Sequence, residues 1–145
     1  MAELVVTQEV AAPQQQVWDV LTDWDVHDRW MLLTKARGGR YEGASLEAFT
    51  GLGRLGFLDP MTVTAWEPPR RAVVRHTGRV VHGSGSFEVE QLAPARSLVV
   101  WSEWVVPPLG AAGRLGWPLV RPLLRQFVQV SLRRLARYVE QGTPA

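Results

Sequence analysis

The sequence predicts an α+β fold in which a curved antiparallel sheet of seven strands surrounds one long C-terminal helix. Two observations predict it. From residue 35 to 106 the chain is a series of short β-type runs divided by Gly and Pro. From about 113 to 141 the apolar residues recur with a helical period instead. One strand and two short helices come before this series, and the length of 145 residues suits a single domain over 1–145.

The N-terminal part begins with a strand over 3–10, where β-branched residues are frequent. Pro13 then occupies a position that is favourable for the first turn of a helix. Apolar residues at helical spacing predict that this helix buries one face. They are Val17, Val20, Leu21 and Trp24. Asp25 is expected to cap a second short helix that runs to about Met31, with His27 facing water.

The six remaining strands are predicted over 36–42, 45–51, 58–66, 71–77, 79–91 and 97–106. Thr77-Gly78 suits a two-residue hairpin turn, which would pair His76 with Arg79. Side chains alternate between the two faces of a strand, so this register also defines an interior face. That face holds Ala72, Val74, His76, Arg79, Val81, Gly83, Gly85, Phe87 and Val89.

The next hairpin, over the sequence LAPA, places Trp101 opposite Phe87 and Glu103 opposite Gly85. A glycine inside a strand often marks a place where another group comes close, so Gly83 and Gly85 indicate free space on the interior side. At these registers His76 and Glu103 lie roughly 20 Å apart, and no acid/base pair is expected between them.

The C-terminal helix has an apolar face that covers half its circumference or more, wider than that of an ordinary surface helix. This face contains Leu119, Val120, Leu123, Leu124, Phe127, Val128, Val130, Ser131, Leu135 and Tyr138. The pattern predicts a helix that a curved sheet surrounds. Pro118 and Pro122 predict a kink or a late start.

This order of elements resembles the helix-grip layout of the START-like (SRPBCC) superfamily, in particular its bacterial polyketide cyclase/dehydrase-like group. The resemblance is carried by VTQEVAAPQQQVWDVLTDWDVHDRW, MTVTAWEPPRRAVVRHTG and LRRLARYVEQ. It implies a deep cavity between the sheet and the long helix, which binds lipids, polyketides or other apolar molecules. Some members are aromatase/cyclases, but no catalytic motif of theirs is found in this chain.

The first functional hypothesis is therefore the binding of a hydrophobic small molecule, lipid or polyketide-like, in that cavity. Trp30 and Met31 would form a gate at one end. The expected ligand-binding residues are Trp30, Met31, Met61, Val74, His76, Val81, Phe87, Trp101, Glu103, Leu124, Phe127 and Ser131.

The alternative is a polyketide cyclase, aromatase or dehydratase that uses acid/base groups in the same cavity. Its candidate catalytic residues are His76, Arg79 and Glu103. A buried charge needs a partner, so a purely structural role is open as well. His76 would then be a hydrogen-bonded residue near the cavity rim, and Glu103 would pair with an Arg.

Other classes are disfavoured. The net charge is only +2, and no basic stripe indicates nucleic-acid binding before the last helix. The G-x-G-x-x-G match at 51–56 precedes a strand rather than a helix, and the Asp residues near His27 lack the spacing of a calcium loop. No cofactor and no metal are expected. The chain has no cysteine and no signal-like N-terminus, so we expect a cytoplasmic protein without stable membrane insertion; a homodimer is left open.

Overall fold

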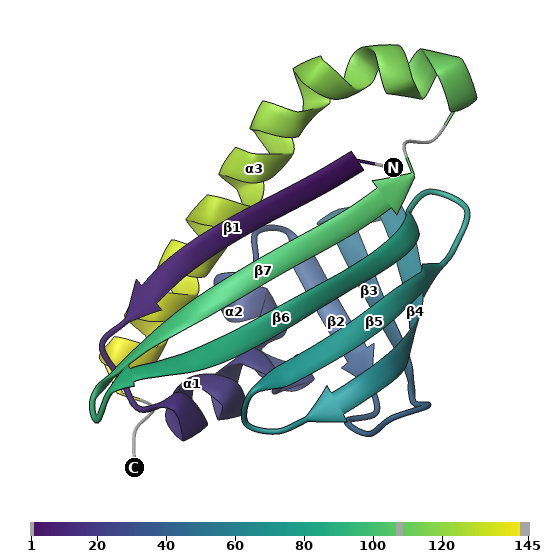
Figure 1. Ribbon diagram of the computed structural model, residues 1–145. Helices are drawn as coiled ribbons and strands as arrows, with labels where there is room; N and C mark the ends of the chain where they lie inside the picture. The colour runs from purple at the N-terminus through teal and green to yellow at the C-terminus, as the bar shows by residue number, and fades with distance from the viewer. Residues whose placement is uncertain (1, 107–108, 143–145) are drawn as a thin grey trace.

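The computed structural model describes residues 2–106 and 109–142. Its strands form one curled, seven-stranded antiparallel sheet in the order β1-β7-β6-β5-β4-β3-β2, with α3 lying across one side (Figure 1). The strands are β1 (Ala2–Val10), β2 (Thr34–Gly38), β3 (Ser45–Leu52), β4 (Leu55–Glu67), β5 (Arg71–Thr77), β6 (His82–Ala93) and β7 (Arg96–Val106). The helices are α1 (Gln14–Leu21), the 3-10 turn η1 (Trp24–Val26), α2 (His27–Trp30) and α3 (Gly110–Glu140). The predicted fold class is confirmed.

The short helices follow from their local sequence. Pro13 precedes α1 as its N-cap in an extended conformation, rather than as its first helical residue. The side chain of Asp23 accepts a hydrogen bond from the backbone N of Asp25 at 3.2 Å and thereby caps η1. The expectation that His27 faces water is wrong, because its side chain is buried at the start of α2.

The β5–β6 hairpin differs from the prediction. Residues 78–81 form a four-residue loop in place of a two-residue turn, so His76 pairs with Gly83 and Val74 with Gly85. A slip by an even number of residues leaves every side chain on its face. The interior face was therefore predicted correctly along both strands, while Arg79 and Val81 moved out of the sheet and into the loop. The β6–β7 register is as predicted, with Phe87 opposite Trp101.

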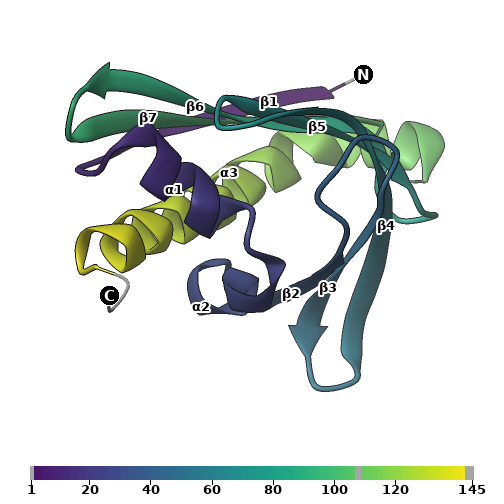
Figure 2. The same cartoon turned by 90° about the horizontal axis from the view of Figure 1, so that it is seen from below.

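The sheet curls around the helices. Seen from below, β3 and β4 turn away from the plane of β1, β7 and β6, and α2 and α3 lie within the angle (Figure 2). The second half of α3 packs into this angle, where Leu132, Leu135 and Val139 are fully buried together with Leu4 and Val6 of β1.

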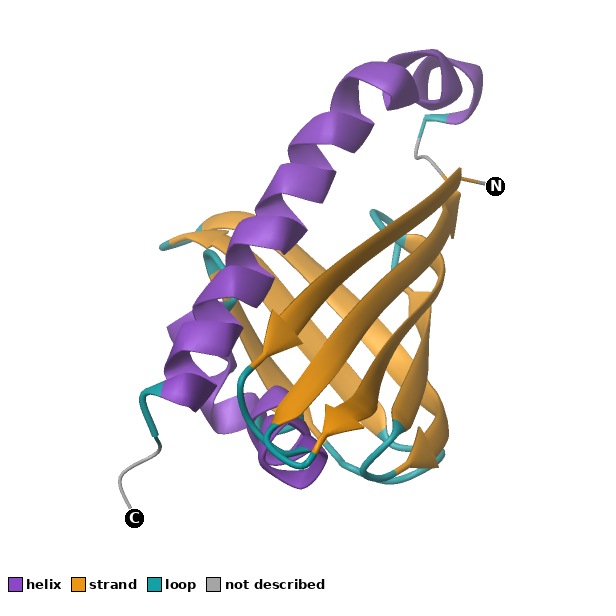
Figure 3. Ribbon diagram, turned by 60° about the vertical axis from the view of Figure 1, so that its left-hand side comes forward, coloured by secondary structure: helices purple, strands orange, loops and turns teal. Residues whose placement is uncertain are grey.

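The first half of α3 is not covered as predicted. Leu119 and Leu123 belong to the expected apolar face, yet they are 78% and 73% exposed. Figures 1 and 3 show that the start of α3 extends beyond the ends of the strands. Pro118 and Pro122 both lie inside α3, where each removes a backbone donor and favours bending. The sheet therefore covers only the C-terminal half of the helix.

Candidate functional site

A pocket of about 540 Å³ lies between α3, the short helices and the inner face of the sheet. Its wall is mostly apolar and includes Phe87 and Trp101 from the sheet and Leu124 and Phe127 from α3. Its charged or ionisable lining residues are His27, Asp59, His76 and Glu103. Three of these four side chains are joined to one another, which concentrates the acid/base chemistry in one place.

The joined residues, Asp59, His76 and Glu103, form what we call the His76 cluster. Nδ1 of His76 lies 2.9 Å from Oδ1 of Asp59, and Nε2 lies 3.0 Å from Oε2 of Glu103. Nε1 of Trp101 donates a further hydrogen bond to Oε1 of Glu103 at 3.1 Å. The imidazole is therefore held at both nitrogens, and one of its two carboxylate partners is itself held by a third side chain.

Three different strands supply the His76 cluster. Asp59 comes from β4, His76 from β5 and Glu103 from β7, so the bond between His76 and Glu103 passes over β6. Gly85 of β6 makes this crossing possible. A Cβ atom on Gly85 would lie 2.7 Å from Oε2 and 2.9 Å from Oε1 of Glu103, closer than side-chain atoms pack. The inward glycine thus provides the space that the Glu103 carboxylate occupies.

Two opposing effects act on the pKa of His76. Burial of the ring disfavours the charged imidazolium and lowers the pKa. The hydrogen bonds to Asp59 and Glu103, together with their charges, outweigh burial and raise the pKa to about 10. At neutral pH His76 is an imidazolium between two carboxylates. It can donate its protons, but it has no free nitrogen with which to accept one.

His27 behaves in the opposite way. Burial lowers its pKa to about 4, and the nearby charge of Asp28 offsets this only in part. Its ring packs edge-on against that of Trp30, with centroids 4.6 Å apart. Nδ1 of His27 and Nε1 of Trp30 are both buried without a hydrogen-bond partner among the described residues. The wall near α2 therefore contains a neutral imidazole with unused hydrogen-bonding capacity.

The catalytic candidates from the sequence divide into two groups. His76 and Glu103 are in direct contact, so the expectation that they lie roughly 20 Å apart is wrong, and the error comes from the β5–β6 register alone. Glu103 pairs with His76 rather than with an Arg. Arg79 is exposed in the β5–β6 loop and does not line the pocket.

Ten of the twelve residues expected to bind a ligand line the pocket. They are Met31, Met61, Val74, His76, Val81, Phe87, Trp101, Glu103, Leu124 and Phe127. The other two, Trp30 and Ser131, are fully buried outside this lining. Ser131 has a structural contact instead, because its Oγ accepts a hydrogen bond from the backbone N of Leu32 at 3.1 Å.

Asp59 and His27 line the pocket but were not among the residues expected there. The position of Asp59 in the pocket could have been predicted, since it lies two residues from Met61 and strand alternation puts both side chains on one face. The position of His27 could not have been predicted from the sequence, because its orientation depends on how α2 packs. No group of three or more His, Asp or Glu within 2–106 and 109–142 has an arrangement that would hold a metal ion.

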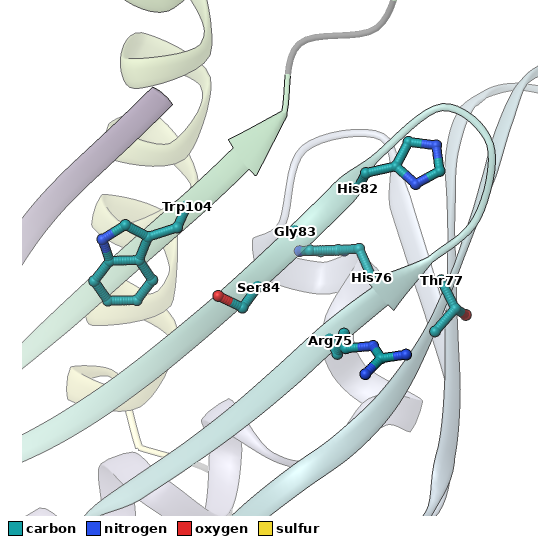
Figure 4. Close-up of a pocket in the computed structure, with 7 residues that line it drawn as sticks. All are labelled: Arg75, His76, Thr77, His82, Gly83, Ser84 and Trp104. Carbon is teal, nitrogen blue, oxygen red and sulfur yellow. The ribbon is translucent and has the colours of Figure 1, made fainter. Parts of the chain in front are cut away.

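A second pocket of about 530 Å³ lies at the same end of the sheet, beside β5, β6 and β7. Figure 4 draws its seven lining residues. Arg75, Ser84 and Trp104 are cross-strand neighbours there. Their strand positions alternate with those of His76 and Glu103, so they belong to the outer face. This surface holds neither carboxylate of the His76 cluster.

The fold is shared with solved structures at low sequence identity. The Zhui aromatase/cyclase of Streptomyces sp. R1128 is 22% identical with a TM-score of 0.74, and the match covers 99% of this chain and 96% of that one. A START superfamily protein from Mycobacterium smegmatis is 17% identical with a TM-score of 0.76, over 97% and 99% of the two chains. The Aha1 dimer of Colwellia psychrerythraea is 16% identical with a TM-score of 0.73, over 99% and 100%.

None of the curated proteins resembles the chain closely enough to count as a match. A family model does match, over residues 1–140, and its description is polyketide cyclase / dehydrase and lipid transport. This match spans nearly the whole chain and agrees with the START-like fold and with the resemblance seen in the sequence. The chain therefore belongs to the polyketide cyclase/dehydrase and lipid transport family.

Proposed function

We propose that this protein binds a largely apolar small molecule, lipid or polyketide-like, in the pocket between the sheet and α3. The observation that carries the proposal is one polar cluster inside an otherwise apolar wall of about 540 Å³. Small-molecule sites commonly combine an apolar lining with a few placed polar groups that orient the ligand. The His76 cluster would orient this ligand, and the aromatic and aliphatic wall would supply most of the affinity.

The charges of the His76 cluster restrict the ligand further. One imidazolium between two carboxylates leaves an excess of one negative charge within an apolar surrounding. A carboxylate ligand would add a second uncompensated charge there, which costs free energy. A hydroxyl group could instead donate a hydrogen bond to Asp59 or Glu103. The proposed ligand is thus a neutral molecule that carries hydroxyl groups, rather than a free fatty acid.

A neutral fluorescent probe, N-phenyl-1-naphthylamine, tests the pocket directly. Its fluorescence should rise on binding, and Ala36→Phe should abolish the rise, because Ala36 lines the pocket. Lys35→Phe is the matched control, since it adds the same ring to an exposed neighbouring position of β2. Equal fluorescence with both variants would show that the probe binds elsewhere. Native mass spectrometry of the purified protein would then identify a ligand that is retained from the cell.

The His76 cluster also supports a second candidate, an enzyme that cyclises or dehydrates a polyketide-like substrate. In an intramolecular aldol condensation the attacking carbon loses a first proton and the attacked carbonyl oxygen gains a second as the C–C bond forms. The aldol then loses its hydroxyl group and a further proton from the attacking carbon as water, which leaves a C=C bond. A carboxylate of Asp59 or Glu103 would accept the first proton, and the His76 imidazolium would donate the second. The pocket would hold the reacting ends together.

The enzyme candidate is tested with a linear triketone thioester, whose aromatic product is followed by absorbance. His76→Gln and Glu103→Gln should slow product formation by about a hundredfold, the usual contribution of a positioned acid or base. Arg79→Gln is the control, because Arg79 lies in an exposed loop outside the pocket. Product formation at the wild-type rate in both cluster variants would exclude this candidate and leave the binding function.

A further inference from the structure

The first half of α3 carries a row of leucines that the described part of the protein does not cover. Leu115, Leu119 and Leu123 are 81%, 78% and 73% exposed, and Leu109, which directly precedes the helix, is 85% exposed. The three leucines within α3 recur every four residues, so they lie on one face of the helix. Figures 1 and 3 show the start of α3 beyond the ends of the strands. So large an apolar surface on one element marks an interaction site rather than an ordinary surface.

This surface adjoins the mouth of the pocket. Of the residues that the structure describes, five both line the pocket and are exposed, and they define the mouth: Phe57, Val80, Val106, Val120 and Leu123. All five are apolar, and they come from β4, the β5–β6 loop, β7 and α3. Leu52 and Leu55 at the tip of the β3–β4 hairpin are exposed as well, at 68% and 82%. The entrance is therefore surrounded by apolar groups on several sides.

Arginine is the most frequent charged residue around the mouth, where Glu3 of β1 lies beside Arg121. Between residues 104 and 125, which include the exposed half of α3, the sequence contains three Arg and no Asp or Glu. Arg54 in the β3–β4 turn and Arg79 in the β5–β6 loop add positive charge on the other sides, again without an acidic neighbour in either turn. A second copy that docked through the same face would bring these arginines together. An anionic surface would instead attract them.

We propose that the apolar mouth is a docking face for an anionic lipid bilayer. The leucines of α3 and of the β3–β4 tip would enter the interface between headgroups and acyl chains, with the arginines at the phosphates. None of the described helices combines the length and apolarity needed to span a bilayer. Contact would thus be peripheral. The proposal rests on the proposed function, since docking would open the pocket toward its apolar ligand.

The test measures cosedimentation with vesicles of phosphatidylcholine plus phosphatidylglycerol, and with vesicles of phosphatidylcholine alone. The protein should bind the anionic vesicles more tightly, and salt should weaken this binding. Leu115→Ser/Leu119→Ser should reduce vesicle binding by about tenfold or more, because the buried apolar area is lost. Neither residue lines the pocket, so N-phenyl-1-naphthylamine should bind this double variant as it binds the wild type.

Leu92→Ser is the matched control, because Leu92 is also exposed but lies near the β6–β7 turn, at the opposite end of the sheet. Failure to bind either vesicle, or an equal loss in Leu92→Ser, would overturn the docking proposal. So would a dimer in analytical ultracentrifugation that Leu115→Ser/Leu119→Ser dissociates, since the face would then bind a second copy. Vesicle binding without probe binding would sustain docking and refute the proposed function.

Discussion

Nε2 of His76 and Oε2 of Glu103 lie 3.0 Å apart although a whole strand, β6, separates the strands that carry them. Neighbouring strands are about 4.8 Å apart, so the two backbones are separated by about twice that distance. The side chains meet because Glu103 extends over Gly85, and Asp59 holds the far side of the imidazole. The properties of His76 therefore depend on residues from four strands.

Removing one charge should change the titration of His76. In Glu103→Gln the amide can still accept a hydrogen bond from Nε2, but the negative charge is gone. The pKa of His76 should fall below its wild-type value of about 10, while Asp59 keeps it above that of a free histidine. NMR titration of the three histidine Cε1–H signals measures this. Glu90→Gln, at an exposed position of β6, is the control, and an unchanged His76 pKa would contradict the assigned pair.

Adding one methyl group at Gly85 should disturb the His76 cluster without removing a polar atom. The Cβ atom of Gly85→Ala would lie 3.0 Å or less from the carboxylate of Glu103, which must move away. We expect a loss of about 1–3 kcal/mol in the free energy of unfolding, together with a lower pKa of His76. Urea unfolding and the same NMR titration measure both effects.

The matched control for this substitution is Gly116→Ala in α3. No atom lies within 4 Å of a Cβ placed there, and alanine favours a helix over glycine by up to about 1 kcal/mol. This variant should be as stable as the wild type or slightly more stable. If Gly85→Ala were as stable as the wild type, the position of the Glu103 carboxylate would not depend on the absence of a side chain at Gly85.

Stability should pass through a maximum near pH 6.5. The pKa of His76 is raised to about 10 in the folded protein. The contribution of the protonated ring to the free energy of unfolding is therefore fully present below pH 6.5 and is lost as the pH rises toward 10. The pKa of His27 is lowered to about 4 in the folded protein, which favours the neutral ring. The folded state is therefore not penalised by this residue above pH 6.5, and the free energy of unfolding decreases as the pH falls toward 4. Urea unfolding over this range measures the profile.

Two variants separate the two sides of this profile. His27→Phe keeps an aromatic ring in the buried site and should make the free energy of unfolding less dependent on pH below pH 6.5. His76→Gln should make the free energy of unfolding less dependent on pH above pH 6.5 and leave its pH dependence below pH 6.5 unchanged. An acid-side slope that persists in His27→Phe would show that other groups cause it.

Ser131 should contribute to stability rather than to ligand binding. Ser131→Ala leaves the backbone N–H of Leu32 without its acceptor, which costs about 1–3 kcal/mol when the group is buried. Chemical denaturation measures this loss, and Ser45→Ala at an exposed position is the control. N-phenyl-1-naphthylamine should bind Ser131→Ala with wild-type affinity. A loss of probe binding without a loss of stability would show that Ser131 contributes to ligand binding instead.

The faces of the strands could be predicted from the sequence, whereas the contacts between distant strands could not. Alternation puts Val74, His76, Gly85 and Glu103 on one side for any register that slips by an even number of residues. The loop of 78–81 then decides whether His76 reaches Glu103, and the pair Thr77-Gly78 resembles a tighter turn than the chain forms. The burial of His27 was also unpredictable, because it results from packing between α2 and the sheet rather than from local spacing.

The pocket also makes folding and binding interdependent. Some 540 Å³ beside the core is lined by side chains but not filled by them, and two buried nitrogens on α2 have no hydrogen-bond partner within 2–106 and 109–142. A molecule that fills this space contributes the packing that further residues would otherwise provide. At a concentration one hundred times its dissociation constant, it would stabilise the folded state by about 2.7 kcal/mol. The melting temperature of this protein is thus a direct readout of occupancy, and a thermal-shift screen could find the ligand before any activity is known.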